Sequence, residues 1–398
     1  MGNFFKTNNL VDCCGCSACE RICPHHCIRF KSNDEGFLYP IKDLDVCVEC
    51  GLCERVCPLS EGYSFESFST PDVYAAYDNN NREGSTSGGV FFTLAEYIIK
   101  EKKGWVFGAA FNDTFLLEHR GVNNMEDLES LRGSKYLQSS MGENFTTIKK
   151  LLNDGQAVLF AGTPCQIAGL RSFLRRKYDG LLLVDVVCHG VPSQSLFNKH
   201  VEYLNHKHKA KLVNYQFRNN DGWGYCETAL FTQPRKMRKL PSFELSPYLY
   251  SFMHAMTFRE SCYDCKFAKV PRQGDISLAD FWGVRHFFPN LDASKGVSLV
   301  LLNSETGRCY FNEIKHKLIT EQSNLHDASR FNNNLINKTP RPGIRDYIYK
   351  EIDKYGYEYV AKTRFRVKHY NIVFLKTYLL GNRLVQKLLS TTKSILKK

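Results

Sequence analysis

Residues 13–24 read CCGCSACERICP, and residues 47–58 repeat the pattern as CVECGLCERVCP. Each segment spaces four cysteines as C-x2-C-x2-C-x3-C and follows the last one with proline. Cys13, Cys16, Cys19 and Cys23 each recur 34 positions later, so residues 13–58 are an internal duplication. We expect the two halves to do the same chemistry and the rest of the chain to serve them.

This spacing is the one that bacterial ferredoxins use to hold two [4Fe–4S] clusters. The first three cysteines of a run lie on a tight loop and bind three corners of one cubane. The fourth cysteine, before the proline, reaches across to the other cluster. The predicted ligands of cluster one are Cys13, Cys16, Cys19 and Cys57, and those of cluster two are Cys47, Cys50, Cys53 and Cys23.

Disulfide bonds and zinc are the alternatives for these cysteines. A disulfide framework needs an oxidising compartment and is typical of short secreted chains. Zinc sites use C-x2-C pairs, but not twin four-cysteine runs that each end in Cys-Pro. The runs therefore favour clusters. Cys14 is out of register and Cys27 lies outside both runs, so we expect these two thiols to pack in the interior.

The chain has 398 residues, 43% of them apolar, which allows two or three domains with a substantial core. No charge-free run approaches the roughly 18 residues of a membrane span, and the first residues lack a signal-peptide core. Sixteen cysteines without an export signal indicate a reducing cytoplasm, where thiolates bind metal. Such clusters are usually sensitive to oxygen, which suggests an anaerobe.

A net charge of +12 would favour binding to nucleic acid, to acidic lipid or to an acidic redox partner. No nucleic-acid motif accompanies the charge, so we expect no nucleic-acid partner. Residues 361–398 carry ten Lys or Arg and no Asp or Glu. A helix that faces a partner or a membrane surface explains this tail better than specific DNA reading. The sequence predicts no particular oligomeric state.

The expected fold class is mixed, α+β and α/β, in three regions. Residues 1–62 form a ferredoxin-like dicluster module, a small βαββαβ fold whose hairpin is the insert near residues 28–40. A polar, Ser-rich linker follows at 61–70. Residues 71–305 form a mixed α/β domain, and residues 306–398 form a helical, basic C-terminal region.

Within the middle region, strand and helix patterns alternate, which predicts a layered α/β domain. Residues 212–243 look instead like antiparallel strands, with residues 223–225 at a turn. The other strands are expected at 73–77, 105–110, 157–161 and 181–187, and the helices at 88–99, 141–152 and 164–175.

Two loops lie where a predicted strand passes into a helix. Residues 82–89, REGSTSGG, end at a helix start, where free N–H groups and the helix dipole could hold an anion, although an ordinary helix start looks the same. Neither a Rossmann fingerprint nor a P-loop occurs. Residues 162–166, GTPCQ, put Cys165 in the crevice where α/β domains bind ligands, and the helix N-terminus there is expected to lower its pKa.

Four cysteines outside the duplication come from three such loops. Cys188 follows the next buried strand, and Cys262 and Cys265 form a C-x2-C pair. With Cys165 they supply the four thiolates that a third [4Fe–4S] cluster needs. The spacing alone leaves zinc or a catalytic thiol equally open. His189 could be a ligand or a proton donor, but lone histidines are more often structural.

Asp280 ends a strand before an aromatic pair and a glycine. It could orient a ligand in the crevice, or it could cap the following turn. Lys135 could meet a phosphate, although a surface lysine is the default interpretation. Cys226 and Cys309 have no partner pattern and are expected to pack.

Six motifs occur along the chain in a fixed order. In this order they resemble the coenzyme F420 hydrogenase/dehydrogenase beta-subunit family, over roughly residues 72–305, with the dicluster ferredoxin module in front. Several independent motifs in order are far more specific than one alone. The motifs are STSGG at 85–89, RGSKY at 132–136, GTPCQIAGL at 162–170, DVVCHGVP at 185–192, CYDC at 262–265 and DFWG at 280–283.

The resemblance implies that residues 71–305 bind FAD beside an iron–sulfur cluster. It assigns the cluster to Cys165, Cys188, Cys262 and Cys265. Cys165 and Asp280 are the candidate catalytic residues. The residues that would contact FAD are Ser87, Gly88, Gly89, Lys135, Gly162 and Thr163.

Members of this family pass electrons between clusters and a two-electron acceptor, which is coenzyme F420 in the archaeal cases. The basic tail after residue 340 departs from the archaeal pattern and resembles bacterial members found alongside surface-polysaccharide enzymes, so another organic acceptor is expected.

We therefore predict an oxidoreductase that depends on FAD and iron–sulfur clusters. Its partners would be ferredoxin or another redox protein, and a small-molecule two-electron acceptor or donor. The alternative is an electron-transfer subunit of a larger redox complex, with no substrate of its own and docked through the basic tail. A non-redox accessory protein of polysaccharide assembly is a third possibility, against which the intact cluster spacing argues.

Overall fold

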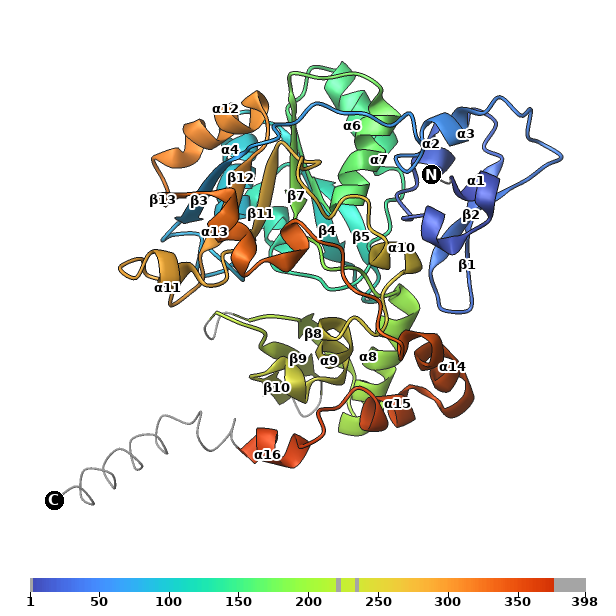
Figure 1. The fold of residues 1–398 in the computed structure, drawn as a ribbon, viewed down its shortest axis with the longest axis vertical. Helices are drawn as coiled ribbons and strands as arrows, with labels where there is room; N and C mark the ends of the chain where they lie inside the picture. Colours follow the sequence, from blue (N-terminus) through green and yellow to red (C-terminus); the bar gives the residue numbers. More distant parts are fainter. Residues whose placement is uncertain (1–2, 220–222, 233–235, 376–398) are drawn as a thin grey trace. The chain divides into compact units, whose positions relative to one another are not determined.

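The computed structural model describes residues 3–219, 223–232 and 236–375 (Figure 1). The chain divides into two compact units. The first contains residues 1–196, 220–223 and 258–341, and the second contains residues 197–219, 224–257 and 342–398.

The first unit is built on an eight-stranded mixed sheet with the strand order β13-β3-β12-β11-β7-β6-β4-β5. Strands β4, β6, β7 and β11 are parallel, and β12 is antiparallel to both β11 and β3. The strands β3, β4, β6, β7 and β11 therefore end at one edge, which we call the carboxyl edge. The bounds are β3 (Asp72–Tyr77), β4 (Trp105–Phe111), β5 (Leu117–Val122), β6 (Val158–Gly162), β7 (Leu181–Val186), β11 (Ile276–Asp280), β12 (Ser298–Leu302) and β13 (Ile319–Ser323).

Helices cover both faces of this sheet, which explains the continuous apolar runs of its central strands. Successive residues of a strand point to opposite faces. Accordingly Leu182 packs with α4 (Val90–Lys100) and α12 (Glu305–Lys315), whereas Leu181 and Leu183 pack with α6 (Asn144–Asn153) and α7 (Pro164–Leu174). The layered α/β architecture is confirmed.

The N-terminal module lies on the α6 and α7 side of the sheet (Figure 1). Its hairpin is confirmed, since β1 (Ile28–Ser32) pairs with β2 (Leu38–Lys42). The prediction of a complete βαββαβ fold is wrong, because β1 and β2 are the only strands among the described residues of the module. Asn3 and Asn9 accept hydrogen bonds from Phe5 and Val11, so the segment before the first cysteine run turns helically instead of forming a strand. The module's helices are α1 (Phe4–Thr7), η1 (Leu10–Asp12), α2 (Ala18–Ile22) and α3 (Leu52–Arg55).

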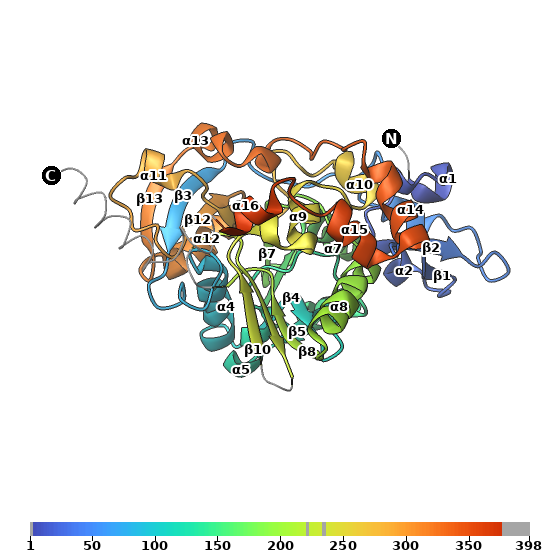
Figure 2. The ribbon, with the colours of Figure 1, turned by 90° about the horizontal axis from the view of Figure 1, so that it is seen from below.

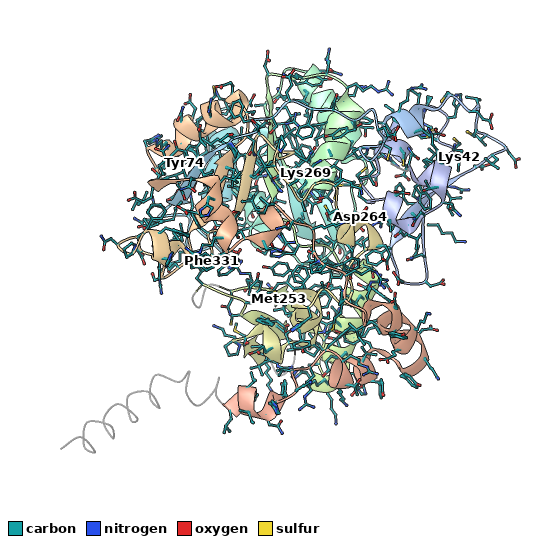
Figure 3. All side chains as sticks on the ribbon, viewed as in Figure 1. Lys42, Tyr74, Met253, Asp264, Lys269 and Phe331 are labelled. Carbon is teal, nitrogen blue, oxygen red and sulfur yellow. The ribbon has the colours of Figure 1, made fainter. Side chains whose placement is uncertain are left out.

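Short helices complete the first unit. They are α5 (Met125–Leu128), η2 (Glu129–Leu131), α10 (Glu260–Tyr263), α11 (Val284–Phe287), α13 (Leu325–Arg330) and η4 (Asn333–Leu335). Helix α10 carries Cys262, the first cysteine of the C-x2-C pair, and Cys265 follows the helix. Asp264, labelled in Figure 3, lies between these two cysteines in the sequence.

The second unit holds a three-stranded antiparallel sheet, as residues 212–243 predict (Figure 2). Its polar core is buried: His200 Nδ1 lies 3.0 Å from the Tyr357 hydroxyl, and the Tyr215 hydroxyl donates to Glu227 over 2.8 Å. The elements are α8 (Gln194–His208), β8 (Leu212–Gln216), β9 (Glu227–Phe231), β10 (Lys236–Leu240), η3 (Phe243–Leu245), α9 (Pro247–Met253), α14 (Arg345–Tyr355), α15 (Tyr357–Thr363) and α16 (Tyr370–Leu375).

The expected domain boundaries need two corrections. The range 306–398 is not all helical, because β13 pairs with β3 at the edge of the large sheet. The side chains of β13 are half-buried or exposed, so it carries no apolar alternation by which a strand could be predicted. Residues 197–219 and 224–257, expected within 71–305, cluster instead with the C-terminal helices.

The basic tail at 361–398 is helical only in part where it is described: residues 361–363 end α15 and residues 370–375 form α16, with non-helical residues 364–369 between them. Residues 376–398 lie outside the described residues. Within the described parts of the chain, no helix combines the length and apolar character that a membrane crossing needs.

A buried ion pair anchors the carboxyl edge. Asp185, at the end of β7, is 0% exposed and accepts from Arg272, which is 1% exposed, over 2.9 Å. The second carboxylate oxygen of Asp185 accepts from the main-chain nitrogens of Gln273 and Gly274. These contacts hold the segment after the C-x2-C pair against the strand that leads to Cys188.

Asp185→Asn is therefore expected to lower the free energy of unfolding by about 3–5 kcal/mol, because Arg272 would stay buried without its countercharge. Urea denaturation followed by circular dichroism measures this change. Glu305→Gln is the matched control, since Glu305 pairs with Arg308 at the surface and should contribute less than about 1 kcal/mol. Equal losses in the two variants would contradict the importance of the buried pair.

Candidate iron–sulfur and cofactor sites

The loops that carry the predicted site residues meet at the carboxyl edge. The 85–89 loop follows β3, the 162–166 turn follows β6, Cys188 follows β7 and Asp280 ends β11. Parallel strands that end at one edge bring such loops into one crevice. In the sequence, these residues are up to about two hundred positions apart.

Four cysteines line one cavity at this edge: Cys165, Cys188, Cys262 and Cys265. Burial and the neighbouring thiols Cys165 and Cys265 raise the pKa of Cys188 to about 12. The expected low pKa of Cys165 is wrong for the metal-free thiols. Its hydrogen bond with Cys14, followed by burial, raises the pKa of the Cys165 thiol well above the usual value. Crowded thiols of this kind ionise readily only when a cation or cluster neutralises them.

Cys14, which was expected to pack, is half-buried against the core and also lines this cavity. Its thiol hydrogen-bonds with that of Cys165. Cys14 follows Cys13, a predicted ligand of cluster one, and thus joins the two sets of thiols.

The predicted ligands of cluster one surround a second cavity, lined by Cys13, Cys16, Cys19 and Cys57. Helix α7 packs against the cysteine loop of this cavity: Cys165 and Gly169 lie one turn apart on the same face of the helix. A side chain at Gly169 would bring its Cβ to 2.8 Å from Cys16 Cβ. The small residue allows the first cysteine loop to lie directly on the helix.

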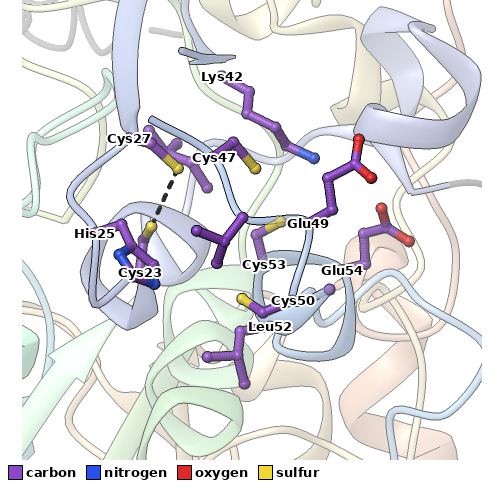
Figure 4. A pocket seen from close by; sticks show the side chains of 13 residues that line it. Cys23, His25, Cys27, Lys42, Cys47, Glu49, Cys50, Leu52, Cys53 and Glu54 are labelled. Carbon is purple, nitrogen blue, oxygen red and sulfur yellow. Dashed lines mark hydrogen bonds between the residues drawn. The ribbon is translucent and has the colours of Figure 1, made fainter. Parts of the chain in front are cut away.

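The predicted ligands of cluster two line a third cavity of about 250 Å³ (Figure 4). They are Cys23, Cys47, Cys50 and Cys53, and Cys50 is exposed. Cys27 also lines this cavity, with its Sγ 3.4 Å from Cys23 Sγ. Burial and then Cys23 raise the pKa of Cys27 to about 12. Cys27 is buried in a small hydrophobic cluster, as expected of a packing cysteine, and it packs directly beside a predicted ligand.

The three cavities form a series, because neighbouring cavities share a lining cysteine. Cys53 lines the cavities of cluster two and cluster one. Cys14 lines the cavity of cluster one and the cavity at the carboxyl edge. The order runs from the exposed Cys50 to the interior of the first unit.

The geometry also bears on the alternatives to clusters. All sixteen cysteines lie in described segments, and none of them forms a disulfide bond. Within the described residues, no three His, Cys, Asp or Glu side chains could bind a single metal ion. Zinc would need its sulfurs about 2.3 Å from one point, whereas each cysteine of a cubane binds a different iron. Thiols that surround a cavity suit a bulky cluster.

The residues assigned to FAD lie in adjoining loops. Gly89 caps α4 with a φ of 83°, and the Thr86 and Ser134 hydroxyls are 3.1 Å apart, which joins the 85–89 and 132–136 loops. Lys135 Nζ donates to the carbonyl of Arg132 over 2.8 Å. Burial, and then the nearby Arg120, lower the pKa of Lys135 to about 7.

Gly162 and Thr163 form the tight turn before α7. The Gln166 side chain accepts from the Thr163 nitrogen over 2.9 Å and completes a capping box. His119, which the sequence does not single out, lies behind this turn, with Nε2 3.0 Å from the Ala161 carbonyl. Burial lowers the pKa of His119 to about 4, so it stays neutral near neutral pH.

Asp280 accepts from Trp223 Nε1 over 2.7 Å, and Trp223 stacks on Trp282 with 4.9 Å between ring centres. The carboxylate is therefore positioned by an aromatic pair at the carboxyl edge. The sequence places Trp223 at a turn and gives no sign of this contact, since it bridges 57 positions. Arg259 and Gln138, which contact the first cysteine loop, were also missed, because an isolated charged or amide residue looks like surface.

Two family models match parts of this chain. Residues 12–60 match the family model of the 4Fe-4S dicluster domain, and residues 155–328 match that of the C-terminal part of the coenzyme F420 hydrogenase/dehydrogenase beta subunit. Taken together, the two matches indicate an iron–sulfur protein of the oxidoreductase class that transfers electrons. The two matches support the resemblance to the coenzyme F420 hydrogenase/dehydrogenase beta-subunit family with an N-terminal dicluster domain.

A chain of the F420-reducing [NiFe] hydrogenase complex from Methanosarcina barkeri is similar in structure, with 14% identity and a TM-score of 0.46. The alignment covers 74% of this chain and 97% of that chain. No curated protein matches the sequence. The four cysteines at the carboxyl edge and Asp280 lie inside the matched residues 155–328, whereas Ser87, Gly88, Gly89 and Lys135 lie outside them.

Gly169→Ala is expected to remove cluster one. Alanine favours a free helix by about 1 kcal/mol over glycine, but here the added Cβ would lie 3.0 Å from Cys16 Sγ and force the ligand loop away. Iron analysis and electron paramagnetic resonance should show a loss of about four irons while the signal of cluster two persists. Gly62→Ala is the control, since its Cβ would meet nothing within 4 Å. An unchanged iron content in Gly169→Ala would refute the contact.

Proposed function

We propose that this protein is an iron–sulfur flavoprotein oxidoreductase. It passes electrons between its ferredoxin-type clusters and a small two-electron acceptor or donor, through a third [4Fe–4S] cluster and FAD. The observation that carries the proposal is the series of three thiol-lined cavities, which runs from the exposed Cys50 to the carboxyl edge of the sheet. Electrons can enter or leave this series where a redox protein such as ferredoxin reaches Cys50.

Two features support a third cluster at the carboxyl edge. Cys165, Cys188, Cys262 and Cys265 share one cavity, and burial followed by the neighbouring thiols raises the pKa of Cys188 and of Cys262. The contact between Cys165 and Cys14, which follows the predicted cluster-one ligand Cys13, supports a one-electron carrier at this position. Thr163 donates or accepts a hydrogen bond at 3.1 Å from Cys165 Sγ and could tune that ligand.

Unsatisfied donors support an anionic ligand beside these cysteines. Among the described residues, Ser87 Oγ and the Nε atoms of Arg82, Arg120 and Arg132 are buried without a hydrogen-bond partner. These atoms lie on or next to the 82–89 and 132–136 loops, and Lys135 adds a titratable cation. A cofactor diphosphate would satisfy such donors at the N-terminus of α4.

When bound, FAD would supply the connection between one-electron transfers and a two-electron transfer. Ser87, Gly88, Gly89 and Lys135 would hold its phosphates, and Gly162 and Thr163 would let it approach Cys165. Asp280, fixed by Trp223, would orient the acceptor or hold a proton at its other carboxylate oxygen.

The first test is cofactor content in anaerobically prepared protein. We expect about twelve irons and one FAD per chain, corresponding to three cubanes on a flavoprotein. Cys262→Ser should retain FAD and about eight irons, lose the third cluster signal and lose electron transfer to the flavin. Cys309→Ser, at an exposed thiol, is the control and should keep all cofactors. Eight irons and no flavin in the native chain would overturn the proposal in favour of an electron-transfer subunit.

The pH dependence of FAD binding tests Lys135. Because its pKa is about 7 in the ligand-free protein, Lys135 is protonated below pH 7 and neutral above it. An anionic cofactor should therefore bind more weakly as the pH rises through 7, by up to about tenfold per pH unit for one linked proton. Fluorescence titration of deflavinated protein measures the affinity. In Lys135→Met this slope should vanish, and a slope equal to that of the native protein would exclude Lys135 from the site.

A further inference from the structure

Arg259 is a buried cation whose partners in the described parts of the chain include no carboxylate. Its side chain is 0% exposed. Its hydrogen bonds go to the carbonyls of Cys13 and Leu38, the amide oxygen of Gln138 and the thiol of Cys13. Arg272, the comparable buried arginine, has Asp185 as its countercharge. A buried guanidinium needs an anion nearby, and the carbonyl and amide dipoles only partly replace one.

The guanidinium is aimed at a predicted ligand of cluster one. Its Nη2 lies 3.3 Å from Cys13 Sγ, and its Nε donates to the Cys13 carbonyl over 2.8 Å. The Tyr39 ring lies 4.0 Å beneath it and fixes its plane. A cluster held by four thiolates is anionic, so cluster one would supply the missing countercharge at this position.

The same residue also reaches the cysteines at the carboxyl edge. The main-chain nitrogen of Cys262 donates to the Arg259 carbonyl over 2.9 Å. Gln138, which accepts from Arg259, donates in turn to the Cys14 carbonyl over 3.0 Å. Arg259 therefore lies at the junction where cluster one meets the Cys14–Cys165 contact.

Space at this junction is limited. A Cβ on Gly15, whose φ is +70°, would lie 2.5 Å from Gln138 Nε2 and 3.1 Å from Arg259 Nη1. The glycine lets the guanidinium and the amide pack against the first cysteine loop.

We propose that Arg259 raises the reduction potential of cluster one. An electron shared between the two clusters would then reside mainly on cluster one, next to the carboxyl edge. A hydrogen bond to a ligand sulfur and a buried positive charge both stabilise the reduced cluster, which carries one more negative charge. When cluster two, reduced, transfers one electron to oxidised cluster one, cluster two is oxidised and cluster one is reduced, and Arg259 favours this direction.

Cluster two has no comparable cation among the described residues that line its cavity. The cation there is Lys42, which is half-exposed, and salt and water screen its charge more strongly. The two clusters therefore differ in the charge beside them, although their ligand spacings are the same. The proposal rests only on the dicluster part of the proposed function, and neither FAD nor the third cluster is needed for it.

A redox titration of the whole anaerobic protein, followed by electron paramagnetic resonance, tests the proposal. Arg259→Gln should lower the midpoint of cluster one and leave that of cluster two in place. The equilibrium constant for electron exchange between the two clusters should change at least about tenfold, which corresponds to about 59 mV for one electron. Cys50→Ser, at the exposed ligand of cluster two, identifies which signal belongs to that cluster.

Two further variants separate tuning from folding. Arg259→Lys keeps the charge but cannot donate to both Cys13 Sγ and the Leu38 carbonyl. The midpoint potential of cluster one in this variant should therefore lie between the values in the native protein and in Arg259→Gln. Gln138→Ala removes a neutral partner and should move the midpoint least.

An Arg259→Gln protein with both clusters filled and an unshifted midpoint would overturn the proposal. Loss of cluster one in both Arg259 variants would overturn it as well, because the guanidinium would then build the site and not tune it. A chain with eight irons and no flavin would refute the proposed flavoprotein but leave this titration fully measurable.

Discussion

The structure depends on a close approach between the first cysteine loop and helix α7. Electrons move between metal centres only over short distances, so the dicluster module must lie against the domain that holds the other thiols. Ala168 and Gly169 leave α7 without bulky side chains at this place, and Cys14 and Cys165 meet one turn away. The order of the three cavities follows from this contact. A larger residue on that face would separate the module from the sheet.

Charge in the interior is handled in two ways. Arg272 is neutralised by Asp185, and this pair holds the loop after the C-x2-C pair to strand β7. Arg259 has only dipoles and a thiol, which leaves its charge available to an anionic cluster. The first arrangement contributes to the stability of the scaffold. The second suits a site whose function requires a change in charge.

The cysteine runs could be interpreted without a structure because their chemistry is local. Twelve residues contain the loop, the spacing and the proline, so the cavities of cluster one and cluster two agree with the predicted ligand sets. The central strands were equally readable, since strands buried on both faces are continuous apolar runs. The edge strand β13 was missed because its side chains are half-buried or exposed and show no pattern. Cys14 and Cys27 pack as expected, but nothing in the sequence indicated that they would line the cavities beside the predicted ligands.

The sequence by itself determined the dicluster module, the α/β class of the large domain and the family resemblance, because these depend on spacing and periodicity over short stretches. Only the tertiary structure decided that Cys14 joins two thiol sets, that Trp223 holds Asp280 and that Arg259 faces Cys13. Arg259 and Cys13 are separated by 246 positions. Contacts at such separations arise from the packing of the module on the sheet, and no local pattern records them.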